Sequence, residues 1–250
     1  MKIIKEIRDK YFLLTKPVKL FALLISSVII IHVSAWVLNE KFGDSFYMYS
    51  SKLVTHSDLF SPAYDGGYFE HFQYILLIWC VILSSIWIIG RKYFEIIYLP
   101  CIYFFLFLDD ALKLHDGVVQ EYFLQIYKEF NLFNNNFIRI EDIAEWSYWI
   151  IVFFLVLIFA RKSFHSKKTE IQKFIKYNFY LFFGMAFFGV FIDMISANWY
   201  RWLAIESTNI KFIVNGLFTV IDDVGEIGVI SIACVWLFNK NFQFSDLEKP

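Results

Sequence analysis

Long apolar runs recur along the whole of this sequence, and they constrain its fold more than any other feature. About 20 apolar residues form a helix long enough to cross the hydrocarbon core of a bilayer. Hydrophobic residues make up 58% of the 250 residues, above the level of about half that is typical of soluble domains. The sequence therefore predicts an all-α, polytopic membrane helix bundle that forms a single transmembrane domain over residues 1–250. The expected spans lie near 18–38, 72–90, 93–114, 146–160, 177–198 and 212–238.

The lysines and arginines between these runs are divided unequally between the two sides of the membrane. If the six spans alternate in direction, the N-terminal segment, the 91–92 turn, the 161–176 loop and the C-terminal tail share one side. That side holds sixteen of the 23 basic residues, and the other side holds seven. Because cytoplasmic loops carry the excess of basic residues, we expect both termini in the cytoplasm, with the bundle in the plasma or inner membrane. The first apolar run is too long for the core of a signal peptide, so we expect it to be retained.

Charge and cysteine usage exclude several other classes of protein. The net charge is -1, and we expect the basic 161–176 loop to contact anionic lipids rather than nucleic acid. Cys80, Cys101 and Cys234 all fall inside expected spans, so the sequence contains neither a disulfide framework nor a CxxC metal motif. The expected partners are the lipid bilayer and a lipid-like or small-molecule substrate. The oligomeric state is not indicated.

Acidic residues interrupt the apolar runs where a carboxylate is costly. A carboxylate near the bilayer centre costs at least ~2.5 kcal/mol. At a rise of about 1.5 Å per residue, Asp109 in FLFLDDALKLHD (105–116) lies ~24 Å along the third span, and Asp193 lies at a similar depth in the fifth. Asp222 and Glu226 lie ~15–22 Å into the sixth span. All four acids are therefore expected at mid-bilayer or nearer its outer face, where they need a proton, a metal ion or water.

Spacing places several of these acids on shared helix faces. The segments EDIAE (141–145) and DDVGE (222–226) each end on an acid four residues after the first, and Asp109 and Asp116 are seven residues apart. Helix bundles bind metal ions with carboxylates and histidines that project inward in this way. The pattern predicts a divalent cation, either Mg, Mn or Fe, or Zn if histidines join. The expected metal ligands are Asp109, Asp116, Glu145, Asp222 and Glu226, with His115 and Asp193 as catalytic residues.

Other polar residues have ordinary structural explanations. Glu141 and Asp142 suit the first turn of a helix, where acids favour the positive end of the dipole. A single histidine on an apolar face, such as His32, is more often hydrogen-bonded in the core, and Glu70 and His71 suit the membrane interface. The sequence leaves open the roles of His32, Glu70, His71, Asp110, Glu141, Asp142 and Asp223.

Three local features add expectations about helix geometry. Residues 118–130 carry apolar side chains at helical spacing, which predicts a short amphipathic helix at the outer interface. Pro100 is expected to kink the third span. Gly184 and Gly189 in the fifth span are expected to allow another helix to approach closely.

The stretch FLDDALKLHD, followed several spans later by IDDVGEIG, resembles a pattern in uncharacterised bacterial multi-pass membrane proteins. In that pattern an acidic pair precedes a His-acid pair, and a late helix carries acid-acid-x-x-Glu-x-x-Gly. In this sequence the glycine is shifted, because Gly228 follows Glu226 by two residues. The resemblance covers roughly the third and sixth spans and implies no activity. Ceramidase-like hydrolases match less well: His71, His115 and Asp109 align loosely, but the paired histidines of a late helix are missing. The last span also lacks the lysine that a rhodopsin needs to hold retinal.

Three functions are compatible with this pattern. The first is a metal-dependent membrane enzyme, a hydrolase or oxidase acting on a lipid or lipid-linked substrate at the outer leaflet, with metal-activated water as nucleophile in the hydrolase. The second is a proton- or cation-coupled transporter or channel that uses the same acids. The absence of a broken-helix pair repeated in two halves of the sequence argues mildly against it. The third is a membrane immunity, sensor or assembly protein that binds a structural ion.

Overall fold

The structure, a computed structural model, describes residues 16–47, 67–114, 117, 120–130, 138–164, 166, 168–203 and 208–247. The described part of the chain is helical and contains no strand, which confirms the predicted all-α class. In chain order the elements are α2 (Lys16–Tyr47), α3 (Tyr68–Arg91), the 3-10 helix η3 (Phe94–Ile96), α4 (Tyr98–Leu112), α5 (Gln120–Glu129), α6 (Ile140–Phe164), α7 (Thr169–Ala186), the π-helix η5 (Phe187–Ile192), α8 (Asp193–Trp202) and α9 (Thr208–Leu247).

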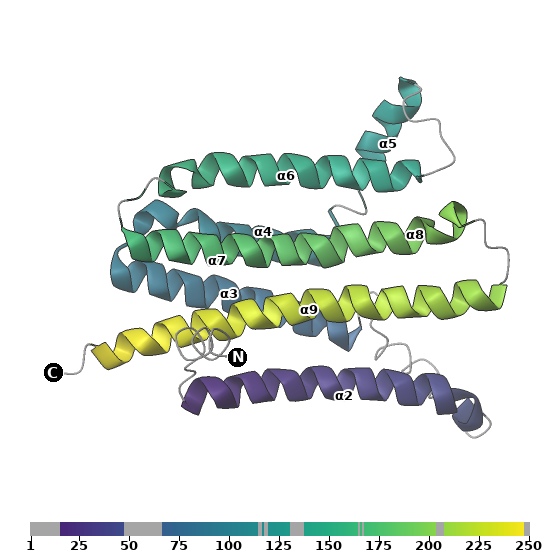
Figure 1. The fold of residues 1–250 in the computed structure, drawn as a ribbon, viewed down its shortest axis with the longest axis horizontal. Coiled ribbons are helices and arrows are strands. Elements are labelled where there is room, and N and C mark those ends of the chain that lie inside the picture. Colours follow the sequence, from purple (N-terminus) through teal and green to yellow (C-terminus); the bar gives the residue numbers. More distant parts are fainter. Residues whose placement is uncertain are drawn as a thin grey trace, which may run out of the picture.

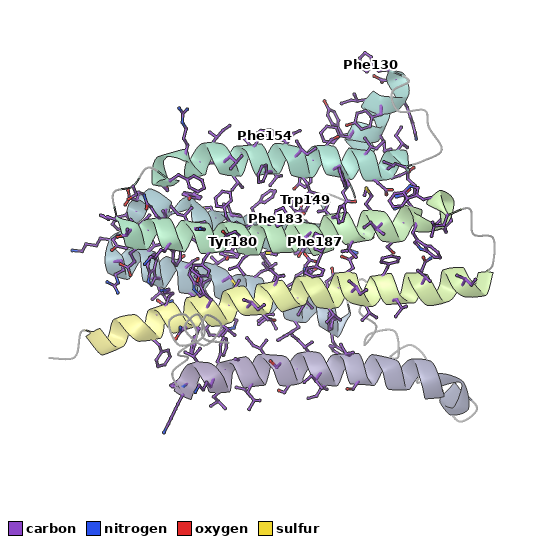
Figure 2. All side chains as sticks on the ribbon, viewed as in Figure 1. Phe130, Trp149, Phe154, Tyr180, Phe183 and Phe187 are labelled. Carbon is purple, nitrogen blue, oxygen red and sulfur yellow. The ribbon has the colours of Figure 1, made fainter. Side chains whose placement is uncertain are left out.

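Three of the helical segments described are long and apolar enough to cross a membrane. They are Tyr68–Arg91, Ile140–Arg161 and Thr169–Tyr200, and they coincide with the second, fourth and fifth predicted spans. Their outward side chains are apolar: Phe154 is 59% exposed, Tyr180 63% and Phe183 71% (Figure 2). Soluble monomers rarely expose such extended apolar surfaces, so these faces suit contact with lipid.

The third predicted span, 93–114, contains a shorter α-helix in the structure, preceded by the 3-10 helix η3. Lys92 adopts a left-handed conformation (φ 56°) and ends α3, and α4 begins only at Tyr98. Pro100 therefore lies in the first turn of α4, where its missing N–H removes no helical hydrogen bond, and the expected kink inside a long span does not arise. Lys113 (φ 49°) then ends α4 after 15 residues. The helix consequently stops short of Asp116, so the face predicted to join Asp109 and Asp116 is not formed by α4.

Helix α9 is central to the arrangement. It contacts α2, α3, α7 and α8, while α5 packs against α6 (Figure 1). Figure 1 also shows that the α3–α4 turn, the start of α7 and the C-terminal end of α9 lie at one end of the bundle, and that α5 lies at the other. The basic 91–92 turn and the described part of the basic 161–176 loop therefore lie at the same end.

Aromatic and polar contacts fix the core where α3, α7 and α9 meet. The rings of Trp87 and Phe174 stack with centroids 3.9 Å apart, and Trp236 packs against Phe174 at 4.9 Å. Aromatic pairs contribute about 0.5–1.5 kcal/mol beyond the area they bury. In the same core Tyr103 Oη donates a hydrogen bond of 2.8 Å to Asn178 Oδ1, and both side chains are fully buried. This contact satisfies both polar groups and holds α4 against α7.

The close packing of α9 against η5 can be tested with one methyl group. A Cβ on Gly225 would lie 2.2 Å from Cδ1 of Phe188, whereas a Cβ on Gly228 would meet nothing within 4 Å. We expect Gly225→Ala to lower the free energy of unfolding by about 1–3 kcal/mol, because the ring must move. Gly228→Ala, the matched control on the same helix, should leave the thermal unfolding midpoint in detergent unchanged or slightly raised. Equal midpoints for the two variants would contradict this packing.

Candidate functional site

The helix that begins at Thr169 changes its winding immediately before Asp193. Helix α7 ends at Ala186, and the π-helix η5 carries the chain to α8, whose first residue is Asp193. π-helical turns are rare and occur frequently at functional sites. A Cβ on Gly189, within η5, would lie 3.2 Å from the carboxyl carbon of Glu226, and one on Gly184 would lie 3.2 Å from the side chain of Val229. The expectation of close helix approach at these two glycines is confirmed.

A buried amide connects acids of two other helices. Gln73 lies on α3, and its Nε2 donates a hydrogen bond of 2.9 Å to Asp110 Oδ2 on α4. Its side chain is also hydrogen-bonded to Glu226 on α9. The neighbouring Tyr74 hydroxyl donates to the backbone carbonyl of Asp110 at 3.2 Å. The amide therefore brings two carboxyl groups from α4 and α9 together beside η5.

Asp109 points to a different helix from Asp110. It is fully buried, and Tyr148 Oη on α6 donates to its Oδ1 at 2.6 Å. Adjacent residues on a helix lie about 100° apart, which explains why the two acids have separate partners. Asp109 thus links α4 to α6, and Asp110 links α4 to α3.

Several acids interact with one another where α9 passes η5 and α8. Glu226 interacts electrostatically with Asp110, Asp222 and Asp223, and Asp222 interacts with Asp193, Asp223 and Glu145. Asp222 Oδ1 is buried without a hydrogen-bond partner among the described residues. We call this group the carboxylate cluster; its members are Asp110, Glu145, Asp193, Asp222, Asp223 and Glu226.

A cation that the sequence analysis did not single out, Arg139, lies at the edge of the carboxylate cluster. Arg139 precedes α6 and binds the buried Asp142 through Nε at 3.1 Å and Nη2 at 2.5 Å. Asn198 on α8 donates to the same carboxylate at 2.5 Å. Burial lowers the pKa of Arg139, but Asp142, and then Asp193 and Glu141, raise it above its ordinary value. Arg139 therefore stays charged beside Asp142. The start of α6 is held to α8 by Asn198, which donates to Asp142 and accepts a hydrogen bond from the backbone N–H of Arg139.

The polar residues at the start of α3 have structural partners. His71 is exposed, and its Nδ1 lies 2.7 Å from the carbonyl oxygen of Gly67. The hydroxyl of Tyr74 donates to Glu70. Both interactions stay within one turn of the helix end, as expected for residues at a membrane interface. The side chain of His32 lies outside those described.

The predicted metal ligands are only partly described. His115 and Asp116 lie outside the described residues. Asp109, Glu145, Asp222 and Glu226 are described, and the last three belong to the carboxylate cluster. Among the described residues, no three His, Cys, Asp or Glu side chains form a group able to hold a metal ion. The divalent metal predicted from the sequence therefore stays a prediction.

The sequence analysis missed the neutral partners Gln73 and Tyr148. Gln73 is an amide within the apolar run FQYILLIWC, and Tyr148 follows Glu145 by three residues, on the same helix face. An amide in an apolar run and a tyrosine one turn from an acid are signals that could have marked them. Neither signal reveals which acid is the partner, because Asp110 and Asp109 are distant in sequence.

The chain has no match among protein-family models, curated proteins or solved structures. The resemblance to bacterial multi-pass membrane proteins therefore stays a prediction, and the candidate site is interpreted from its own geometry.

Proposed function

We propose that the chain is a proton- or cation-coupled transporter or channel, with the carboxylate cluster as its ion-binding site and H⁺ as the first candidate ion. One observation carries this proposal. The carboxyl group of Glu226 packs closely against Gly189 in the π-helix η5, and it interacts electrostatically with three other acids. A carboxyl group among like charges and away from bulk water must bind a proton or another cation.

The neutral partner of Glu226 supports H⁺ as the ion. Gln73 contacts both Asp110 and Glu226, and an amide can donate to two carboxyl groups without neutralising either charge. A proton bound by one of these acids lowers the negative charge that they share. When the proton leaves, the amide still orients both oxygens for its return.

The irregular helix beside the cluster supports transport over a fixed site. Transporters place ion sites where transmembrane helices depart from regular geometry, and here η5 leads directly into Asp193, a member of the carboxylate cluster. Close to this cluster, Arg139 and Asn198 both donate hydrogen bonds to Asp142, which joins the start of α6 to α8.

The finer topology belongs to the same proposal: six spans with both termini in the cytoplasm. The α3–α4 turn and the start of α7 would then be cytoplasmic, and α5 would lie outside. Cysteines introduced at Lys168 and at Lys128 should be labelled by a membrane-impermeant maleimide from opposite sides of sealed vesicles. Labelling of both positions from one side would contradict the topology.

Reconstitution tests the proposed function. Purified full-length protein in liposomes containing a pH-sensitive dye should acidify the interior when an inside-negative potassium diffusion potential is imposed, faster than protein-free liposomes. A parallel arm with a sodium-sensitive dye tests Na⁺ as the ion. Rates equal to those of protein-free liposomes in both arms would contradict the proposal. A stoichiometric transition metal in the same preparation, lost on Asp222→Asn, would favour the metal-dependent enzyme, which stays a prediction.

A further inference from the structure

Three cations from three helices lie near Glu170 at the end of the bundle remote from the carboxylate cluster. Arg91 ends α3, Lys173 lies in the second turn of α7, and Lys240 lies near the end of α9. Arg91 Nη2 is 3.9 Å from Glu170 Oε1, and Lys240 interacts electrostatically with Glu170, Lys173 and Arg91. These residues are far apart in sequence, so the helix packing alone brings them together.

The charges at this place are unbalanced. Among the described residues here, Lys168 joins the three cations and Glu95 joins Glu170. Four cations and two carboxylates leave two positive charges in excess. Glu170 is also hydrogen-bonded to Tyr93, whose hydroxyl donates to its Oε2 at 3.0 Å. Burial lowers the pKa of Lys240; Glu170 opposes this effect, while Lys173 and Arg91 add to it. An anion seated among the three cations would relieve their mutual repulsion.

Aromatic rings place these cations at the depth of lipid headgroups. Lys240 Nζ lies over the ring of Trp236, 5.9 Å from its centroid, and Trp236 packs against Phe174 and Tyr177. Lys176, one turn further along α7, lies 5.8 Å from the ring centroid of Tyr180. Tryptophan and tyrosine gather where the hydrocarbon core meets the headgroups, and basic pockets between helices at this level bind anionic headgroups.

We propose that the ends of α3, α7 and α9 form a binding site for the phosphate headgroup of an anionic phospholipid, held by Arg91, Lys173 and Lys240. Lys173 is exposed and can approach the phosphate from the outer face of the bundle, while Arg91 and Lys240 are half-buried. The acyl chains would then extend along the apolar surface of the helices. This site is separate from the carboxylate cluster and does not depend on the proposed ion transport.

Native mass spectrometry of the full-length protein in detergent tests this site. With phosphatidylglycerol and phosphatidylcholine supplied at equal concentration, we expect preferential retention of phosphatidylglycerol. The double variant Lys173→Gln/Lys240→Gln should bind it about tenfold more weakly, because each basic residue contributes separately to the attraction. Lys128→Gln, which removes an exposed lysine of α5 at the other end of the bundle, should bind it like the unmodified protein.

Two further arms make the test decisive. Lys173→Arg/Lys240→Arg keeps both charges, so it should restore the preference even if the glutamine variant folds poorly. Equal retention of the two lipids, or equal weakening by Lys128→Gln, would overturn the proposal. Displacement of phosphatidylglycerol by millimolar inorganic phosphate would show a site for free phosphate and would overturn the assignment to a lipid.

Discussion

Glu226→Gln should reduce potential-driven proton entry into proteoliposomes to the rate of protein-free liposomes. The substitution keeps the size of the side chain and its hydrogen-bonding capacity toward Gln73, but an amide cannot bind and release a proton at neutral pH. Glu226 interacts electrostatically with Asp110 of α4 and with Asp222 and Asp223 of α9. The substitution removes all three of these interactions. The dye-based rate measured at equal protein content gives the result.

Glu121→Gln is the matched control for this variant. Glu121 lies exposed on α5, so the same chemical change there should leave the proton rate unaltered. Gly189→Ala adds a geometric arm, since its Cβ would lie 3.2 Å from the Glu226 carboxyl group, and we expect it to slow proton entry without abolishing it. A Glu226→Gln rate equal to that of Glu121→Gln would contradict a role for Glu226 in the ion path.

Arg139→Gln should give the largest loss of stability among the substitutions considered. It removes the Nε and Nη2 groups that donate to the Asp142 carboxylate, and Asp142 is only 3% exposed. Asn198 on α8 still donates to this carboxylate. Removing one partner of a buried ion pair leaves an uncompensated charge, which costs about 3 kcal/mol. The measurement is the free energy of unfolding of the purified protein in detergent.

The double variant Arg139→Gln/Asp142→Asn distinguishes the ion pair from simple loss of packing. With the carboxylate also removed, no buried charge is left uncompensated, so the double variant should be more stable than Arg139→Gln alone. Coupling between contacting residues makes their effects non-additive in this way. Strictly additive losses for the two substitutions would show that the charges of Arg139 and Asp142 are not energetically coupled.

The helices themselves could be predicted because apolar periodicity is a local signal. The predicted spans at 72–90, 146–160 and 177–198 lie inside segments that are long and apolar enough to cross a membrane, and the short helix expected at 118–130 is α5 (Gln120–Glu129). The turn at 91–92 was predicted, and α3 ends there at Lys92. The early end of α4 could not be predicted, since it depends on Lys113 in a left-handed conformation. Lysine carries no sequence signal for that conformation, unlike glycine.

The members of the carboxylate cluster were largely identified from sequence, but their partners were not. Depth along a helix predicted that Asp222 and Glu226 lie far from bulk water on both sides. It could not show that Gln73 joins Asp110 to Glu226, because these contacts link positions more than thirty residues apart. The π-helix η5 was missed for a similar reason: its winding follows from packing against α9, which the order of residues in FFGVFI does not encode.

Infrared spectroscopy of the reconstituted protein at neutral pH tests the central claim most directly, because the carbonyl stretch of a protonated carboxyl group is separate from the stretches of a carboxylate. The claim is that the carboxylate cluster holds a proton at Glu226, beside Gln73 and Gly189. We expect the unmodified protein to show a protonated-carboxyl band that shifts in D₂O and that Glu226→Gln removes. Absence of the band from the unmodified protein, or an unchanged band in Glu226→Gln, would contradict the claim.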